Sequence, residues 1–172
     1  MKKIVLVYGF ISGVIAGALM LTTMPFMNKL EGGTGLAVGY TGILLSGLLI
    51  FFGVRSYREN VGGGTITFGK GFQVGILIAV ISSCFYVATW ELIYFKLEPD
   101  FCDKHFGAQV ERLKASGAPP EKIAEAEQQL ASMKKLLANP VTNAAMAFIE
   151  PFPVDLLITL VSAAVLRKKP VQ

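Results

Sequence analysis

The sequence predicts an all-α polytopic membrane protein, with four transmembrane helices and an extracytoplasmic helical hairpin between the third and fourth. The 172-residue chain is 53% hydrophobic and only 16% charged, whereas soluble domains carry about 25% charged residues. Its apolar residues form four long blocks, and nearly all of its charges lie between those blocks. This composition excludes a disordered chain, a secreted disulfide scaffold and a soluble enzyme.

The four apolar blocks are long enough to cross a bilayer, which takes about 20 residues for a hydrocarbon core of about 30 Å. Lipid offers no partner to unpaired backbone groups, so each span must be a helix. We expect spans at residues 4–28, 34–54, 71–95 and 143–166 of a single membrane domain, 1–172.

The first block has a competing interpretation as a cleaved signal peptide, because Lys2 and Lys3 precede an apolar run with an Ala16-Gly17-Ala18 site. That run continues to Met27, longer than a typical signal core, which favours retention of the helix. Cleavage would leave the other three helices in the same orientation.

Basic residues concentrate on one side of the spans. That side carries eight basic residues and one acid, Glu59, for a net charge of +7, whereas the other side holds eight basic and eight acidic residues. The basic residues are Lys2, Lys3, Arg55, Arg58, Lys70, Arg167, Lys168 and Lys169. The positive-inside bias therefore predicts that both termini and the 55–70 loop lie in the cytoplasm. No nucleic-acid motif accompanies these charges, so we expect lipid and no nucleic acid as partner.

Small residues recur at four-residue spacing in two of the predicted helices. The first helix carries Gly9, Gly13 and Gly17, and the third carries Gly71 and Gly75, followed by Ala79 and Ser83. Such stripes let helix backbones approach closely, so we expect helix packing there. A dimer interface or a ligand groove stays open, and with it a homo-oligomer or a membrane-protein partner.

The loop before the third helix contains Gly64-Thr65-Ile66-Thr67-Phe68-Gly69-Lys70-Gly71, which nearly matches a nucleotide-binding P-loop. Position 71 has no hydroxyl for magnesium, and membrane helices flank the loop instead of a buried strand and a soluble helix. The sequence therefore predicts no nucleotide binding. A flexible loop entering the third helix is the better account.

The segment 99–138 is the one sizeable extramembrane part, and its pattern predicts two helices. Pro99 ends the third helix, and residues 116–120 contain the break. After the break, Ile123, Ala126, Leu130, Met133 and Leu137 repeat at intervals of three and four, which predicts a narrow apolar stripe. Burial of the two helices against each other is favoured over a partner-binding surface.

No catalytic motif is present, so we predict no enzyme and no cofactor. The sequence lacks G-x-S-x-G, H-E-x-x-H and C-x-x-C. Cys102, Asp103 and His105 are neighbours, but three nearby residues on one short helix seldom complete a metal site, so we predict none.

Acidic residues inside the spans give the candidate polar site, which comprises Glu91, Glu150, Asp155, Thr159 and Ser162. A carboxylate in the bilayer costs several kcal/mol and normally faces protein or water. Asp155, Thr159 and Ser162 share one helical face, and Pro151 and Pro153 predict a break just before it. Broken helices with polar groups near the midplane are typical of transport sites. An interfacial kink without such a role is the favoured alternative.

The order of these features resembles domain-of-unknown-function family 4199, a family of small bacterial four-helix membrane proteins. The resemblance rests on Tyr8-Gly9, on the segments 53–58 and 63–72, on Pro99-Asp100-Phe101 and on Arg167-Lys168-Lys169. Glu150-Pro151-Phe152-Pro153 departs from the plain apolar start of the fourth helix that the family implies. The family has no established activity, so no catalytic residues follow from it.

Two functions are therefore expected from the sequence. The first is a structural or interaction protein of the bacterial inner membrane. The second is a small transporter or channel, proton-linked through the intramembrane acids.

Overall fold

The computed structural model describes residues 1–27 and 34–168, so Lys169, one of the basic residues that follow the fourth predicted span, lies outside them. The described residues form helices joined by turns, with one isolated β-bridge. The predicted all-α fold is thereby confirmed.

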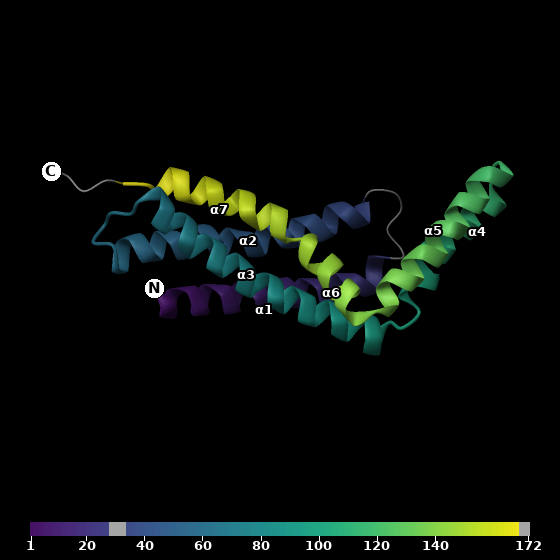
Figure 1. Cartoon of the computed structure of the whole chain (residues 1–172), viewed down its shortest axis with the longest axis horizontal. Helices are drawn as coiled ribbons and strands as arrows, with labels where there is room; N and C mark the ends of the chain where they lie inside the picture. The colour runs from purple at the N-terminus through teal and green to yellow at the C-terminus, as the bar shows by residue number, and fades with distance from the viewer. Residues whose placement is uncertain (28–33, 169–172) are drawn as a thin grey trace. The chain divides into compact units, whose positions relative to one another are not determined.

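The helices follow one another in the order shown in Figure 1. Their bounds are α1 Lys2–Met27, α2 Thr34–Asn60, α3 Phe68–Leu92, η1 Ile93–Leu97, η2 Asp103–Gly107, α4 Ala108–Ala115, α5 Pro120–Ala138, α6 Pro140–Ile149 and α7 Phe152–Leu166. The segments η1 and η2 are single π-helical turns.

Four helical segments of the described chain are long and apolar enough to cross a membrane. They are Lys2–Met24, Ala37–Asn60, Phe68–Leu97 and Pro140–Leu166. The last is interrupted between α6 and α7, where Glu150 and Pro151 leave the helix. Proline removes a backbone donor and clashes with helical geometry before it, so Pro151 and Pro153 account for the break. Four such spans indicate a multi-pass membrane protein.

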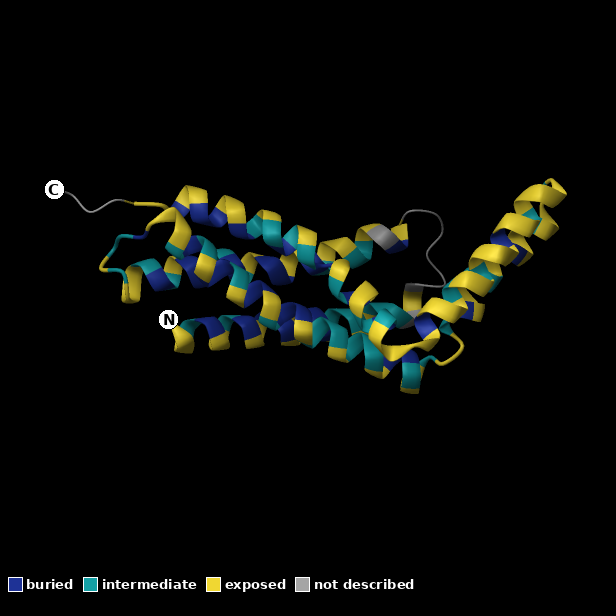
Figure 2. Cartoon of the chain, in the orientation of Figure 1, coloured by how far each residue is buried: buried dark blue, intermediate teal, exposed yellow. Residues whose placement is uncertain are grey.

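The chain divides into two compact units, residues 1–89 with 147–172 and residues 90–146. In unit 1, the helices α1, α2, α7 and most of α3 run side by side (Figure 1). Their inward sides are buried and their outward sides exposed (Figure 2). The core includes Val5, Ile50, Val54, Val74, Ile78 and Leu166. Exposed apolar side chains such as Leu6 and Phe10 suit contact with lipid.

The loop between α2 and α3 is held to the end of α7. The amide of Ile66 donates to the carbonyl oxygen of Lys168, and the amide of Lys168 donates to that of Ile66, both at 3.0 Å. Gly63 and Gly64 take φ values of +59° and +82°, which glycine adopts without strain. Gly64 and Ile66 belong to the segment that resembles a P-loop, whose first residues here form a turn and a bridge before α3 begins at Phe68.

Unit 2 contains the helical hairpin. Gly117, with φ +68°, lies in the turn between α4 and α5, and Pro120 is the first residue of α5. Val110 on α4 is buried, as are Ala126 and Leu137 on α5. The chief ion pairs within the unit are Lys104–Glu98, Lys134–Asp103 and Lys114–Glu127. Unit 2 thus buries part of the predicted apolar stripe, with Leu137 packed in a cluster with Tyr94 and Cys102.

Candidate functional site

The helix break brings Asp155 into the interior of unit 1. Asp155 lies in the first turn of α7, where its amide donates to the carbonyl oxygen of Pro151 at 3.0 Å. Pro153 lies two residues earlier in the same turn and is tolerated there, since the first amides of a helix have no intrahelical acceptor. The Asp155 residue is only 3% exposed and is close to the middle of the Pro140–Leu166 span. The break therefore puts a carboxyl group deep in the bundle.

Glycine on α2 leaves the space that the Asp155 carboxyl group occupies. A Cβ atom on Gly47 would lie 2.9 Å from Oδ1 of Asp155 and 2.5 Å from Cδ1 of Ile158. Both values are shorter than real Cβ contacts, so the α2 backbone borders the carboxyl group directly. The sequence analysis did not single out Gly47 as a site residue, because it belongs to no four-residue stripe of small residues.

On its other side α7 packs against the small residues of α3. A Cβ atom on Gly71 would lie 3.2 Å from Cα of Ala163, and one on Gly75 would lie 2.8 Å from Cγ2 of Thr159. Gly71 meets Ala163 and Gly75 meets the earlier residue Thr159, so α3 and α7 are antiparallel. One further turn therefore brings the buried Ala79 to the level of Asp155.

Within unit 1, three buried polar side-chain atoms on α3 and α7 have no hydrogen-bond partner in the described part of the chain. They are Oδ1 of Asp155, Oγ1 of Thr159 and Oγ of Ser83. Ser83 continues the Gly71, Gly75, Ala79 stripe of α3, the stripe that packs on α7. Buried polar groups are nearly always paired, so three unpaired oxygens on neighbouring helices indicate a site for a proton, a water molecule or a cation.

A separate group of buried hydroxyls joins three helices in unit 1. Ser12 on α1 donates to the carbonyl oxygen of Ser46 on α2 at 2.8 Å, and its oxygen lies 2.9 Å from Oγ of Ser82 on α3. Ser46 donates to the carbonyl oxygen of Ile43 at 2.9 Å. Each serine is close to the middle of its span. We call Ser12, Ser46 and Ser82 the serine triad.

The sequence analysis missed the serine triad, because a single serine in an apolar helix forms no periodic pattern. Its position halfway along a predicted span is the one signal that could have found it. The triad and Asp155 occupy a similar depth, since Gly47, which borders Asp155, directly follows Ser46.

The predicted site residues are brought together only in part. Asp155, Thr159 and Ser162 are all buried on α7. Glu150 lies at the helix break, is exposed, and accepts a hydrogen bond from the Tyr86 hydroxyl at 2.9 Å. Glu91 belongs to unit 2, where its Oε1 is buried without a partner in the described chain. Within unit 1, Asp155 and not Glu150 is therefore the buried acid.

The glycine stripe of α1 packs closely on α3. Cβ atoms placed on Gly9, Gly13 and Gly17 would lie 2.8 Å from Ile81, 2.5 Å from Phe85 and 2.6 Å from Thr89, respectively. The partners on α3 also recur every four residues, so two complementary stripes are in contact.

Unit 2 has a polar contact that sequence reasoning also missed. Asn143 is fully buried, accepts a hydrogen bond from the Trp90 indole at 2.5 Å and donates to the carbonyl oxygen of Leu137 at 2.9 Å. Phe101 packs edge-on against Trp90 and stacks on His105, with ring centroids 5.0 and 5.4 Å apart. His105 therefore takes part in an aromatic cluster.

Within the described residues, no group of three His, Cys, Asp or Glu side chains is arranged to hold a metal ion. Cys102 is buried, with its sulfur 3.5 Å from the Tyr94 hydroxyl.

Comparison with known proteins gives a family and no relative of known activity. Neither the curated proteins nor the solved structures contain a match to this chain. The model of one family, described as a protein of unknown function (DUF4199), matches residues 7–168, nearly the whole chain. This four-helix chain with its interrupted last span therefore belongs to the DUF4199 family.

Proposed function

We propose that this chain is a small proton-linked transporter or channel of the bacterial inner membrane, in which Asp155 takes up and releases the proton. The buried Asp155 carboxyl group carries this proposal. It is near mid-span and 3% exposed, and its Oδ1 has no partner among the described residues. An uncompensated charge there costs several kcal/mol. A carboxyl group that exchanges a proton avoids that cost while protonated.

The surroundings of Asp155 fit this role. Thr159 and Ser83 supply unpaired hydroxyl oxygens on α7 and α3 that can hydrogen-bond to the protonated carboxyl group or to a water molecule. The break at Pro151 separates α7 from α6, and transporters use such broken helices around midplane sites. Together these groups would line a short path for a proton through the interior of unit 1.

The proposed orientation has both termini in the cytoplasm and the α4–α5 hairpin outside. The charge balance supports this orientation. The side with the termini and the α2–α3 loop carries a net charge of +7, whereas the charges on the other side cancel.

The test is proton flux in liposomes that contain the purified protein and an internal pH dye, under an imposed membrane potential. We expect flux with the wild type and loss of flux in Asp155→Asn, which keeps the shape of the side chain but removes the titrating group. Glu150→Gln is the matched control, since it makes the same chemical change at an exposed carboxyl group. The proposal would be contradicted if liposomes with the wild-type protein showed no more proton flux than empty liposomes. It would also be contradicted if Asp155→Asn carried the same flux as the wild type.

A structural or interaction protein of the same membrane is the second candidate. The serine triad and the tight contact of Gly9, Gly13 and Gly17 with α3 support it, because both serve to hold helices together. In that case the wild type carries no flux, and Asp155→Asn leaves the unfolding midpoint in detergent unchanged or raises it. Copurification of a membrane-protein partner or a second copy would then define the interaction.

A further inference from the structure

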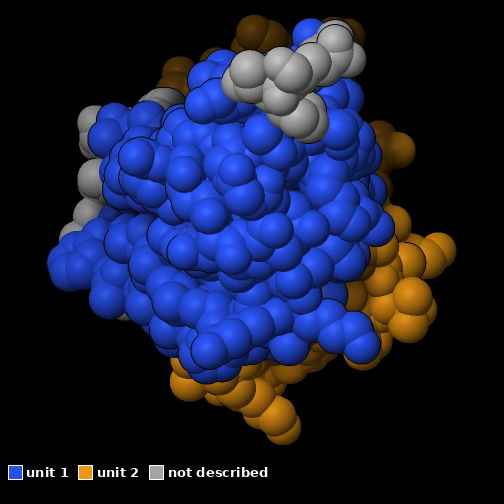
Figure 3. Space-filling view, turned by 90° about the vertical axis from the view of Figure 1, so that its left-hand side faces the viewer, with its two compact units in different colours: residues 1–89, 147–172 blue, residues 90–146 orange. Residues whose placement is uncertain are grey.

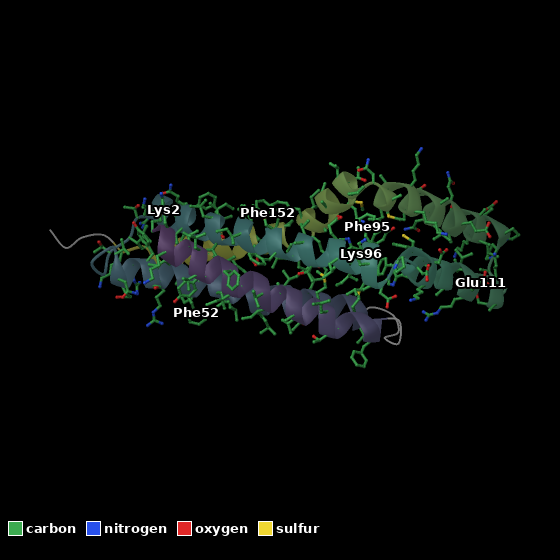
Figure 4. All side chains as sticks on the ribbon, turned by 90° about the horizontal axis from the view of Figure 1, so that it is seen from below. Lys2, Phe52, Phe95, Lys96, Glu111 and Phe152 are labelled. Atoms are coloured by element: carbon green, nitrogen blue, oxygen red, sulfur yellow. The ribbon has the colours of Figure 1, made fainter. Side chains whose placement is uncertain are left out.

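Cations from three separate parts of the chain gather at one end of unit 1. The N-terminus, the α2–α3 loop and the end of α7 lie at this end (Figure 1), which Figure 3 faces directly. Lys2 marks the start of α1 there (Figure 4). Arg55 and Arg58 come from the last turns of α2, and Arg167 and Lys168 follow α7.

Backbone contacts hold these cations in place. The two hydrogen bonds between Ile66 and Lys168, at 3.0 Å, tie the residues after α7 to the α2–α3 loop. Nη1 of Arg58 also donates to the carbonyl oxygen of Leu166 at 3.3 Å, across 108 positions of sequence. Arg167 lies between these two contact points. These contacts between α2, the α2–α3 loop and the end of α7 therefore fix the backbone that carries the cations.

Positive charge exceeds negative charge at this surface. Glu59 is its one acid in the described part of the chain, and it accepts hydrogen bonds from Nε and Nη2 of Arg58 at 2.9 and 2.5 Å. Arg55 and Lys168 lie within electrostatic range of the same carboxylate. Arg55, Arg167 and Lys168 are exposed, and none has a carboxylate within ion-pair distance among the described residues.

We propose that Arg55, Arg58, Arg167 and Lys168 form a binding surface for the phosphate groups of anionic phospholipids in the leaflet that this end faces. All four candidate spans of the described chain begin or end here, at Lys2, Asn60, Phe68 and Leu166, so the cations are at headgroup level. Phe68, the first residue of α3, has an exposed ring that stacks on Phe72. One guanidinium group can donate two hydrogen bonds to two oxygens of the same phosphate group. Each basic residue near an anionic membrane surface adds to the electrostatic attraction.

The test compares lipid binding by two variants of the full chain with equal loss of charge. Arg55→Gln/Arg167→Gln/Lys168→Gln removes three cations from the surface and spares Arg58, which also contacts Leu166. The control, Arg112→Gln/Lys122→Gln/Lys135→Gln, removes three exposed cations of unit 2. Each protein is titrated in neutral detergent with phosphatidylglycerol or phosphatidylcholine, and bound lipid is counted by native mass spectrometry. Unfolding midpoints verify that all the proteins are folded.

We expect phosphatidylglycerol to bind the wild type and the unit 2 variant equally well, and the surface variant about tenfold or more weakly. Phosphatidylcholine should bind all three alike and weakly. Equal phosphatidylglycerol affinity in the two variants would overturn the proposal. Displacement of the lipid by millimolar inorganic phosphate would do so too, because it would reveal a site for soluble phosphate instead of lipid.

Discussion

The Ser12 hydroxyl of α1 donates its one proton to the carbonyl oxygen of Ser46 on α2, at 2.8 Å. A hydroxyl group has a single proton, so the 2.9 Å contact between Ser12 and Ser82 must use the proton of Ser82. Ser12 therefore joins α2 and α3 to α1 through one oxygen atom. Ser12 is fully buried, and Ser46 and Ser82 are each 3% exposed.

Ser12→Ala should destabilise the bundle by about 0.5–1.5 kcal/mol, because interhelical hydrogen bonds in membrane proteins contribute about that much and the Ser82 hydroxyl loses its acceptor. The control is Thr41→Ala, whose exposed hydroxyl donates, among the described residues, to the carbonyl oxygen of Ala37 within its own helix. The measurement is thermal unfolding in one detergent. Equal midpoints for the two variants would contradict the role assigned to Ser12.

Leucine at Gly13 or Gly75 should lower the unfolding midpoint strongly. A Cβ atom alone would lie 2.5 Å from Phe85 or 2.8 Å from Thr159, so a whole leucine side chain must separate α3 from its neighbours. We expect a loss of about 1–3 kcal/mol or more. Gly39→Leu is the control, since a Cβ atom there meets nothing within 4 Å. A midpoint for Gly13→Leu equal to that of Gly39→Leu would show that the stripe faces lipid.

The four spans and the break in the last one are predictable from the sequence, because both depend on local properties. A 20-residue apolar block needs a helix in lipid, and a proline in the interior of a helix removes a backbone hydrogen bond and disfavours the helical geometry of the residue before it. The shared face of Asp155, Thr159 and Ser162 follows from helical periodicity alone. Long-range register has no such local signal. Ser12 and Ser82, 70 positions apart, and Trp90 and Asn143, 53 apart, meet only after the helices have packed.

The orientation in the membrane can be tested by cysteine labelling. In a chain with Cys84→Ser and Cys102→Ser, one new cysteine replaces either Val61, which is 51% exposed after α2, or Ser116, which is exposed in the hairpin turn. A membrane-impermeant thiol reagent applied to intact cells should label Ser116→Cys and not Val61→Cys. Lysed cells, in which both should react, provide the control. The reverse pattern in intact cells would invert the proposed topology.

Asn143→Ala should destabilise unit 2, because it leaves the Trp90 indole N–H and the Leu137 carbonyl oxygen without their partner. A buried group left unpaired costs about 1–3 kcal/mol. Lys114→Gln is the comparison variant. Lys114 forms an ion pair with Glu127 at 2.9 Å, and this hydrogen bond raises the pKa of the lysine. Because the pair is exposed, it contributes little to the free energy of unfolding. Trp90 fluorescence during unfolding reports on this unit. A larger effect for Lys114→Gln than for Asn143→Ala would contradict the assignment.

The contact between Gly47 and Asp155 is best tested by a double-mutant cycle, which isolates one pair from its surroundings. A methyl group on Gly47 would lie 2.9 Å from Oδ1 of Asp155 and 2.5 Å from Cδ1 of Ile158. The Ile158 methyl group is the end of a flexible side chain and contributes equally with or without the carboxyl group, so the cycle cancels it. Gly47→Ala should therefore cost at least about 0.5 kcal/mol more in the wild type than in an Asp155→Ala background. Gly42→Ala is the matched control on the same helix, since its Cβ atom would meet only Leu19, at an ordinary 3.7 Å. A coupling energy for Gly47 no larger than that for Gly42 would mean that the α2 backbone does not border the Asp155 carboxyl group.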